Sequence, residues 1–446
     1  MIVVVLLAVV AVVALLGAAH WYVWFRLVRS TTENRTARRV GAVVVTVLPL
    51  LSFAALGSSR SGAPFWLERI LAWPGYFWLA VLLYLVLFLL AGEVVRAAWL
   101  RVAARRAGAD AEKEAAEEAV EETEAESPAL ASAAAAPAPT PTPAPTPTPA
   151  PTPIPAAAPA PADRPAPAPA AVSRRTFVSR VVGAGAATAA LGTVGYGAYG
   201  VLNGPSVKRV TVPLAKLPRS AHGFRIAVVS DIHLGPILGR GHTQRIVDAI
   251  NSTSPDLVAV VGDMVDGNVA DLGPAAEPLT QLRAKHGSFF VTGNHEYFSG
   301  AQQWVDHVRE LGLRPLENER VEIAAGFDLA GVDDVEGEKE GKGPDFAKAL
   351  GDRDRSRASV LLAHQPVVIH DAVDHGVDLQ LSGHTHGGQL WPGPYLAGLA
   401  NPTVAGLERY GDTQLYVTRG AGAWGPPVRV GAESDITVVQ LASRRA

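Results

Sequence analysis

The sequence lacks cysteine and is poor in charge. None of its 446 residues is cysteine, which excludes disulfide bonds, zinc sites built from thiolates and enzymes with a cysteine nucleophile. Charged residues make up only 18% of the chain, whereas 48% of the residues are hydrophobic, and the mean hydropathy is +0.18. This composition is too apolar for a purely soluble protein, so we expect part of the chain to lie in a membrane.

An excess of basic residues is also missing. The net charge of the whole chain is -3, and from Pro205 to the end 23 Lys and Arg stand against 29 Asp and Glu. Proteins that bind DNA or RNA usually carry a cationic surface. We therefore expect no nucleic-acid partner.

Long apolar runs are abundant in the first hundred residues. They cover residues 2–25, 40–57 and 76–100; the second contains Pro49 and the third carries Glu93 near its end. At about 1.5 Å per residue, the first is long enough to cross a hydrocarbon core of roughly 30 Å. The alternative is that the three runs are core helices of a soluble domain. The connections between them are too short to supply the residues that would surround such helices. We expect residues 1–106 to form a transmembrane region with about three helices.

Arginines are distributed unevenly around these runs. Only Arg60 and Arg69 lie between the second and third runs. Nine others follow the first run or surround the end of the third: Arg26, Arg29, Arg35, Arg38, Arg39, Arg96, Arg101, Arg105 and Arg106. Because loops rich in Lys and Arg remain in the cytoplasm, we expect the N-terminus outside and residue 106 inside.

Residues 107–172 predict an acidic segment followed by a disordered linker rich in Pro, Ala and Thr. The stretch 107–127 is rich in Ala and Glu and could be helical, whereas proline occupies every second position from Pro137 to Pro155. Such a tract favours polyproline II and buries no core. At about 3.1 Å per residue the tract to Pro169 could span roughly 100 Å as a spacer.

Residues 173–204 predict a membrane anchor. The segment 173–178 has the sequence Ser-Arg-Arg-Thr-Phe-Val and precedes an uncharged stretch with six glycines, residues 181–202. It resembles a twin-arginine export signal, although Val178 stands where Leu is usual and the motif is internal. A fourth transmembrane helix is an equal alternative. Both place the part after Asn203 outside the cytoplasm, still attached because no clear cleavage site follows.

Residues 205–446 are ample for one large α/β domain. Short runs rich in Val and Ile predict strands at 225–229, 257–261, 288–291, 360–363 and 377–381. Helical patterns follow at 242–251, 279–285 and 302–311, and further strands are predicted at 322–323, 328–330, 415–418 and 436–440. This alternation predicts a layered α/β core.

A residue that can bind a metal follows each of the first five predicted strands. The segments are Asp231-x-His233, Gly262-Asp263-x-x-Asp266, Gly293-Asn294-His295-Glu296, His364 and Gly383-His384-x-His386. In open α/β sheets ligands bind beyond the carboxyl ends of strands, so these residues should converge. Taken singly, each segment has an ordinary interpretation as a cap, a turn or a core histidine.

Together and in this order, the five segments resemble the calcineurin-like metallophosphoesterase superfamily over residues 220–440. Its signature is D-x-H, G-D-x-x-D, G-N-H-[DE], an isolated His and G-H-x-H. The segments 331–334, 384–389 and 419–422 resemble its membrane-anchored bacterial phosphodiesterase branch, whose animal relative also has several spans. The resemblance implies a layered αββα domain after the multi-span helical region.

The resemblance also implies roles for single residues. Asp231, His233 and His386 would hold the first metal. Asn294, His364 and His384 would hold the second, with Asp263 bridging the two ions. His295 would face the substrate, and Asp266 would brace the second motif as an outer-shell carboxylate. Two cations about 3.5–4 Å apart activate a shared water and clamp a phosphate oxygen. The mixed Asp, Asn and His shell favours Mn, Fe or Zn.

These observations predict a membrane-anchored phosphoesterase with its catalytic domain outside the cytoplasm. The substrate would be a phosphorylated small molecule or lipid, as monoester, diester or pyrophosphate. The alternative is a membrane scaffold or transporter-like protein with a non-catalytic metal-binding domain.

Residues outside the motifs have plainer interpretations. We expect His222, His242, His286, His307, His370 and His375 to be surface or capping residues. The apolar stretch 395–410 is either ordinary packing or a lipid-facing lip beside the site.

Overall fold

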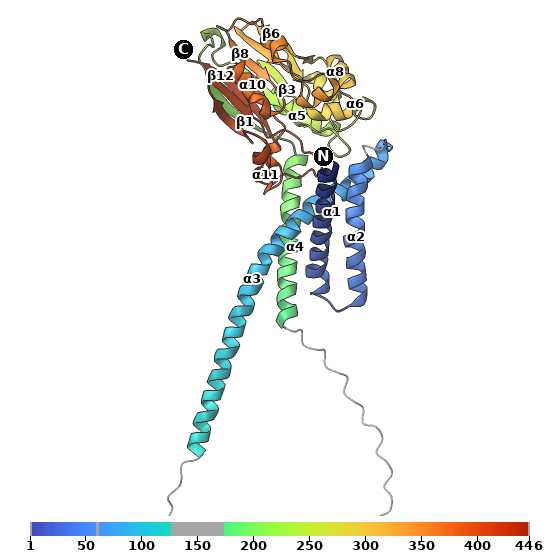
Figure 1. Cartoon of the computed structure of the whole chain (residues 1–446), viewed down its shortest axis with the longest axis vertical. Coiled ribbons are helices and arrows are strands. Elements are labelled where there is room, and N and C mark those ends of the chain that lie inside the picture. Colours follow the sequence, from blue (N-terminus) through green and yellow to red (C-terminus); the bar gives the residue numbers. More distant parts are fainter. Residues whose placement is uncertain (1, 59–61, 126–173, 445–446) are drawn as a thin grey trace, which may run out of the picture.

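The computed structural model describes residues 2–58, 62–125 and 174–444. It consists of long helices and an α/β domain at one end of them (Figure 1). The proline tract predicted as a spacer lies outside the described residues.

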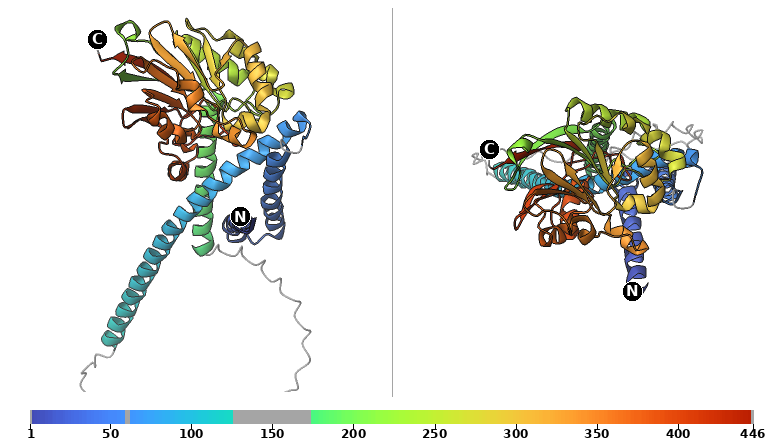
Figure 2. Two further views of the ribbon diagram at one scale, coloured as in Figure 1. Left: turned by 45° about the horizontal axis from the view of Figure 1, so that its top comes forward. Right: turned by 90° about the horizontal axis from the view of Figure 1, so that it is seen from above.

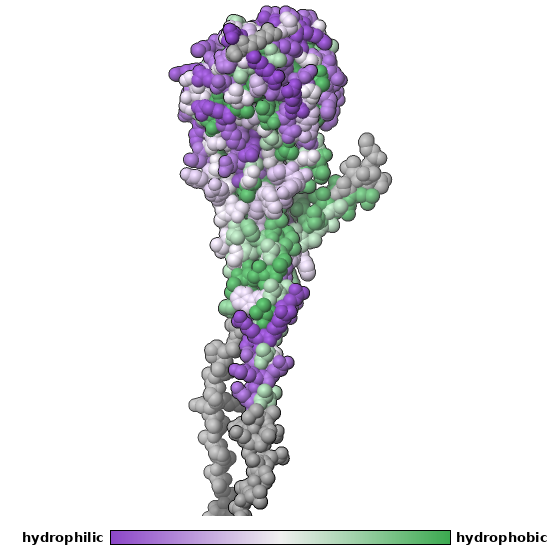
Figure 3. All heavy atoms as spheres, turned by 90° about the vertical axis from the view of Figure 1, so that its left-hand side faces the viewer, coloured by the Kyte–Doolittle hydropathy of each residue, from purple (hydrophilic) through white to green (hydrophobic). Residues whose placement is uncertain are grey.

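Four long helices precede the α/β domain: α1 (Ile2–Trp24), α2 (Arg35–Ser58), α3 (Phe65–Ala125) and α4 (Arg174–Leu202). A π-helical turn, η1 (Phe25–Arg29), extends α1. All four are long and apolar enough to cross a membrane. Hydrophobic surface gathers over these helices, beneath the more hydrophilic domain (Figure 3).

Helix α3 is longer than the sequence predicts. Its 61 residues span roughly 90 Å, about three times the thickness of a hydrocarbon core. The predicted boundary at residue 106 is not a break, because the stretch to Ala125 consists mainly of strong helix formers such as Ala and Glu. The residues 107–125, whose Ala and Glu content allowed a helix in the sequence analysis, therefore continue α3. In Figure 2, α3 runs obliquely beneath the domain and crosses α4.

The arginine-rich ends of the helices lie far from the α/β domain. The connection from α1 to α2 and the start of α4 are at the opposite end of the bundle (Figure 1). Here Glu93 forms ion pairs with Arg26 and with Arg96, whose Nη2 is 2.8 Å from Oε2 of Glu93. Arg180 donates from Nε to the carbonyl oxygen of Thr31 at 2.8 Å.

Two six-stranded sheets form the α/β domain. The first has the order β1 (Ser206–Leu214), β12 (Asp435–Ser443), β2 (Arg225–Val229), β3 (Leu257–Val261), β4 (Ser288–Val291) and β5 (Arg314–Pro315). The second has the order β10 (Gly406–Tyr410), β11 (Thr413–Val417), β9 (Leu379–Ser382), β8 (Ala358–Leu362), β7 (Phe327–Gly331) and β6 (Glu319–Ile323).

Buried side chains of both sheets form one core between them. Ile226 of the first sheet and Leu329 and Val360 of the second belong to this cluster and have no exposed surface. Burying an aliphatic side chain of this size stabilises the fold by about 1.5–3 kcal/mol. The predicted layered αββα arrangement is confirmed.

Helices cover the outer faces of the sheets. The first sheet packs against α5 (Arg240–Ser252), α6 (Val269–Ala276) and α8 (Ala301–Glu310) through a second cluster that includes Ile246, Leu272 and Trp304. The second sheet packs against α9 (Phe346–Leu350) and α10 (Ile369–Asp374). Two further short helices are α7 (Asn294–Ser299) and α11 (Gly393–Ala400).

The helix predicted over 279–285 is wrong. Asn268 caps the start of α6 by accepting a hydrogen bond from the backbone N of Asp271 at 3.0 Å, so the helix begins ten residues earlier. Only a 3₁₀ turn, Glu277–Gln281, follows it.

Candidate metal centre

The predicted ligands lie in short loops directly after parallel strands. Strands β2, β3 and β4 are parallel, as are β8 and β9. Asp231, Asp263 and Asn294 follow the first three, and His364 and His384 follow the other two. Since the carboxyl ends of parallel strands meet at one edge, the structure brings all seven predicted ligands together there.

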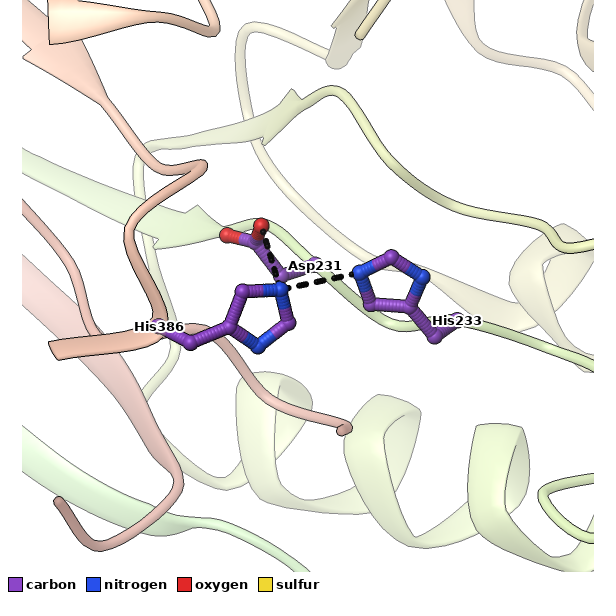
Figure 4. Close-up of side chains that lie close together, drawn as sticks. All are labelled: Asp231, His233 and His386. Carbon is purple, nitrogen blue, oxygen red and sulfur yellow. Dashed lines mark hydrogen bonds and ion pairs between the residues drawn. The ribbon is translucent and has the colours of Figure 1, made fainter. Parts of the chain in front are cut away.

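The first cluster contains Asp231, His233 and His386 (Figure 4). Nε2 of His233 lies 3.0 Å from Nε2 of His386, which in turn lies 3.3 Å from Oδ1 of Asp231. The three side chains are almost fully buried.

The second cluster contains Asp263, His364 and His384. Nε2 of His364 lies 3.1 Å from Oδ2 of Asp263, and Nδ1 of His384 lies 3.0 Å from Oδ1 of Asn294. The same oxygen of Asp263 is 3.8 Å from Nε2 of His233 in the first cluster. Asp263 therefore lies between the two clusters.

Two of the histidines are oriented as metal ligands. Nδ1 of His364 is 2.9 Å from the carbonyl oxygen of Val261, and Nδ1 of His233 is 2.9 Å from Oδ1 of Asp266. Because both partners only accept, a ring proton lies on Nδ1, and Nε2 is the atom that faces the cluster and would bind a cation once it carries no proton. Metal-binding histidines are commonly held in this way, so the donor set fits divalent cations.

The backbone is strained at the same positions. Asp231, His233, Asp263, His384 and His386 have positive φ, and they are five of the eight non-glycine residues with this conformation in the described chain. Each such residue costs about 1–3 kcal/mol, and such residues cluster at functional sites. The local strain therefore marks the same loops as the ligand pattern.

Two glycines allow the carboxylates to approach. A Cβ atom at Gly293 would lie 2.3 Å from Oδ1 of Asp263, and one at Gly383 would lie 2.4 Å from Oδ2 of Asp231. Both distances are far below van der Waals contact, so the motifs require glycine here.

The two buried carboxylates of the clusters differ in pKa. Burial raises the pKa of both, but the charge and hydrogen bond of His364, together with His233, outweigh burial at Asp263 and bring its pKa well below the usual range. The pKa of Asp231 is raised by burial and by the nearby charge of Asp263. A cation beside both carboxylates would offset the cost of burying these charges.

His295 lies at the edge of the first cluster. Its ring meets that of His233 edge-on, with centroids 4.7 Å apart, and its Nδ1 is 2.6 Å from Oδ1 of Asp266. Burial lowers the pKa of His295, but the bond and charge of Asp266 outweigh it and raise the pKa to about 9. Asp266 itself contacts both histidines directly, which defines the bracing role that the sequence predicted for it only in general terms.

Glu296 supports the site, although no role is predicted for it from the sequence. This carboxylate is fully buried and accepts hydrogen bonds from three backbone N–H groups, those of Gly293 (2.7 Å), Asp263 (2.9 Å) and Met264 (2.8 Å). Burial and the charge of Asp263 raise its pKa to about 7. Glu296 thus joins the loops after β3 and β4. A charged residue three positions after the N-cap glycine of α7 was the available signal.

Ser230 and Arg429 also support the site from outside the predicted ligand set. The Ser230 hydroxyl donates to Asp231, and the buried guanidinium of Arg429 donates to Nδ1 (3.1 Å) and to the backbone oxygen (2.9 Å) of His386. Since a guanidinium only donates, the proton of the neutral His386 ring lies on Nε2. Nothing in the sequence near Arg429 indicates this contact.

None of the seven other histidines belongs to a metal-competent group among the described residues. The prediction of a surface or capping position is wrong for His242. It is buried on α5, because its side of the helix packs on the domain, and burial lowers its pKa to about 4.

Comparisons with known proteins agree with this site. Residues 224–388 match the family of calcineurin-like phosphoesterases. A zebrafish (Danio rerio) transmembrane protein with metallophosphoesterase domain is 40% identical over 259 residues, which cover 54% of this chain and 59% of that protein. An uncharacterized metallophosphoesterase of Helicobacter pylori strain J99 is 38% identical over 272 residues, 60% of this chain and 72% of that protein.

A third relative is matched over nearly its whole length. An uncharacterized metallophosphoesterase of Aquifex aeolicus is 35% identical over 239 residues, 53% of this chain and 91% of that protein. The residues that match the family, 224–388, lie in the α/β domain and include all the predicted ligands, and the resemblance inferred from the motifs is confirmed. The chain belongs to the calcineurin-like metallophosphoesterase family.

Proposed function

We propose that this protein is a two-metal hydrolase of phosphoester bonds. The position of Asp263 carries this proposal, because its carboxylate contacts His364 of one cluster and approaches His233 of the other. Asp231, His233 and His386 would hold one ion and Asn294, His364 and His384 the other. Their mixed nitrogen and oxygen donors suit Mn, Fe or Zn.

The residues around the clusters suit the reaction. A bound pair of cations would activate water and stabilise negative charge on the phosphoryl group. His295, with a pKa of about 9, carries a proton at neutral pH. It lines the pocket beside His233, where it can donate to a phosphate oxygen or protonate the leaving oxygen. Asp266 holds the ring in place.

The α/β domain is proposed to lie outside the cytoplasm, with residues 126–173 inside. Support comes from the basic residues at the bundle end far from the domain, including Arg174 and Arg175 at the start of α4 (Figure 1). The exposed apolar side chains Tyr395, Leu396 and Leu399 of α11 suit an adjoining lipid surface. We therefore propose a lipid or another envelope component as substrate.

The alternative function, a scaffold or transporter-like protein, finds less support. Among the described spans, Glu93 forms ion pairs with Arg26 and Arg96 at the bundle end far from the domain. A path for a solute would favour polar groups along the bundle interior.

Release of the alcohol product by the purified full-length chain tests the proposal, because hydrolysis of a monoester or of a diester frees an alcohol. The protein in detergent is treated with chelator, then given Mn, Fe or Zn and offered phosphomonoesters, phosphodiesters and glycerophospholipids. We expect hydrolysis of at least one class, lost after chelation and restored by metal. A folded protein that hydrolyses none of them with any metal would contradict the proposal.

A further inference from the structure

The pocket at the candidate metal centre extends beyond the α/β domain. Its volume is about 800 Å³, and it is lined by His233, Asp266 and His295 at one end. Side chains of the membrane helices line another part: Leu56 of α2 and Glu68 and Tyr76 of α3. One site is thus built from two parts of the chain that are far apart in sequence.

The helix pair that reaches the pocket is packed closely. We call residues 55–58 and 65–76 the membrane hairpin. The hydroxyl of Ser52 donates to the carbonyl oxygen of Gly75 at 2.7 Å, and a Cβ atom at Gly75 would lie 2.8 Å from that of Ala55. Small residues here let the two helices approach closely.

The hairpin and the neighbouring helices also contact the domain. Phe65 packs against the cluster under the outer helices of the first sheet. The hydroxyl of Tyr84 on α3 donates to the carbonyl oxygen of Trp391 at 3.1 Å. The backbone N of Arg429 donates to the carbonyl oxygen of Gly197 on α4 at 3.3 Å. These contacts hold the pocket opening against the membrane helices.

Apolar side chains line the pocket beside and beyond His295. Leu56, Phe298 and Trp424 line it and are 40%, 62% and 53% exposed. No Lys or Arg is found among the described residues that line this pocket. A second phosphate, as in a nucleotide, would therefore find no cationic partner there, whereas an aliphatic chain would find apolar contacts.

We propose that the membrane hairpin is part of the substrate site, and that the substrate is an amphiphile with one phosphate ester at the head of an aliphatic tail. The inference rests on the proposed hydrolase function and adds the class of substrate. The tail enters between Leu56 and the rim formed by Phe298 and Trp424, while the phosphate reaches His295. The substrate thus approaches from the lipid side.

Matched esters that differ only in tail length test this inference. The full-length chain in lipid nanodiscs, loaded with metal, is given hexadecyl phosphate or its methyl diester, and butyl phosphate or its methyl diester. We expect kcat/KM to be at least about tenfold higher for the long-tailed ester of whichever class is hydrolysed. Leu56→Trp, which fills the apolar part of the pocket, should remove most of that preference.

The control is Leu50→Trp on the same helix, since Leu50 is 61% exposed and does not line the pocket. It should leave both rates unchanged. A second measurement, independent of activity, follows the labelling of one introduced cysteine, since the chain has no cysteine of its own. In the variant Leu56→Cys, hexadecyl phosphate should slow labelling by a soluble maleimide severalfold, and butyl phosphate should not.

The two proposals fail in different ways. Equal kcat/KM for long and short esters, or a Leu56→Cys labelling rate that neither ester changes, would overturn the role of the hairpin and leave the hydrolase intact. If none of the four esters is hydrolysed while another phosphoester is, the inferred substrate class is overturned; if no phosphoester of any class is hydrolysed, the hydrolase function itself is overturned.

Discussion

Nδ1 of His295 lies 2.6 Å from Oδ1 of Asp266. The carboxylate, which also contacts His233 at 2.9 Å, keeps the His295 ring protonated and aligned beside the first cluster. Because a protonated ring does not bind a cation, this contact supports our proposal that His295 donates a proton and does not bind metal.

Replacing His295 by Ala should leave metal binding intact and slow hydrolysis of alkyl esters by about 10²-fold or more, because an alkoxide needs a proton as it leaves. The loss should be distinctly smaller for an aryl ester such as a nitrophenyl phosphate, whose leaving group needs none. Steady-state kinetics on both esters and elemental analysis measure this. His370→Ala, an exposed histidine on α10, is the control and should match wild type. Loss of metal, or equal losses on both esters, would contradict the role.

Activity should depend on the protonation of His295. The raised pKa of about 9 means that the proton-donating form is present below this pH and is lost above it. The alkaline limb of kcat/KM for an alkyl ester should therefore fall near pH 9. In Asp266→Asn the limb should move towards the ordinary histidine value of about 6.5. The exposed Asp374→Asn serves as control. An unchanged limb in Asp266→Asn, with metal still bound, would show that another group titrates.

The same pair affects folding stability with pH. Since the folded pKa of His295 is raised, its contribution is complete below the unfolded value of about 6.5 and is lost as the pH rises through about 9. The free energy of unfolding of wild type should fall over this window more than that of His295→Ala. Denaturant unfolding at several pH values measures the difference, and parallel curves for the two proteins would count against it.

Glu296→Ala should destabilise the α/β domain. It leaves three buried backbone N–H groups without an acceptor, and each unsatisfied donor costs about 1–3 kcal/mol. We expect a lower Tm and weaker metal binding, because the loops that carry Asp263 and Asn294 lose their link. The control Glu408→Ala removes an exposed carboxylate on β10. If Glu296→Ala melts at the wild-type temperature, the link is not structural.

The proposed orientation can be measured with single cysteines in a chain that has none of its own. Cysteine at the exposed position Glu408 of the domain should react with an impermeant maleimide in intact cells. Cysteine at the exposed position Asp110 of α3 should react only after the cells are opened. The reverse pattern would place the domain in the cytoplasm.

Much of the α/β domain could be predicted because its central strands are buried on both sides and appear as continuous runs of Val and Ile. Strands β1 and β10 escaped prediction, since both contain exposed or half-buried positions that interrupt such runs. The ligand loops could be predicted because each motif lies within a few residues. The contacts of Arg429 and of the membrane hairpin join residues far apart in the sequence, so no local pattern encodes them.

The metal content of the purified full-length chain tests the central claim most directly. Elemental analysis should give two divalent ions per chain in wild type. Asp263→Asn should lower this number more than replacement of any ligand that serves one ion, because only Asp263 lies between both clusters. A folded, freshly purified wild-type protein that holds no metal after incubation with Mn, Fe and Zn would contradict the account.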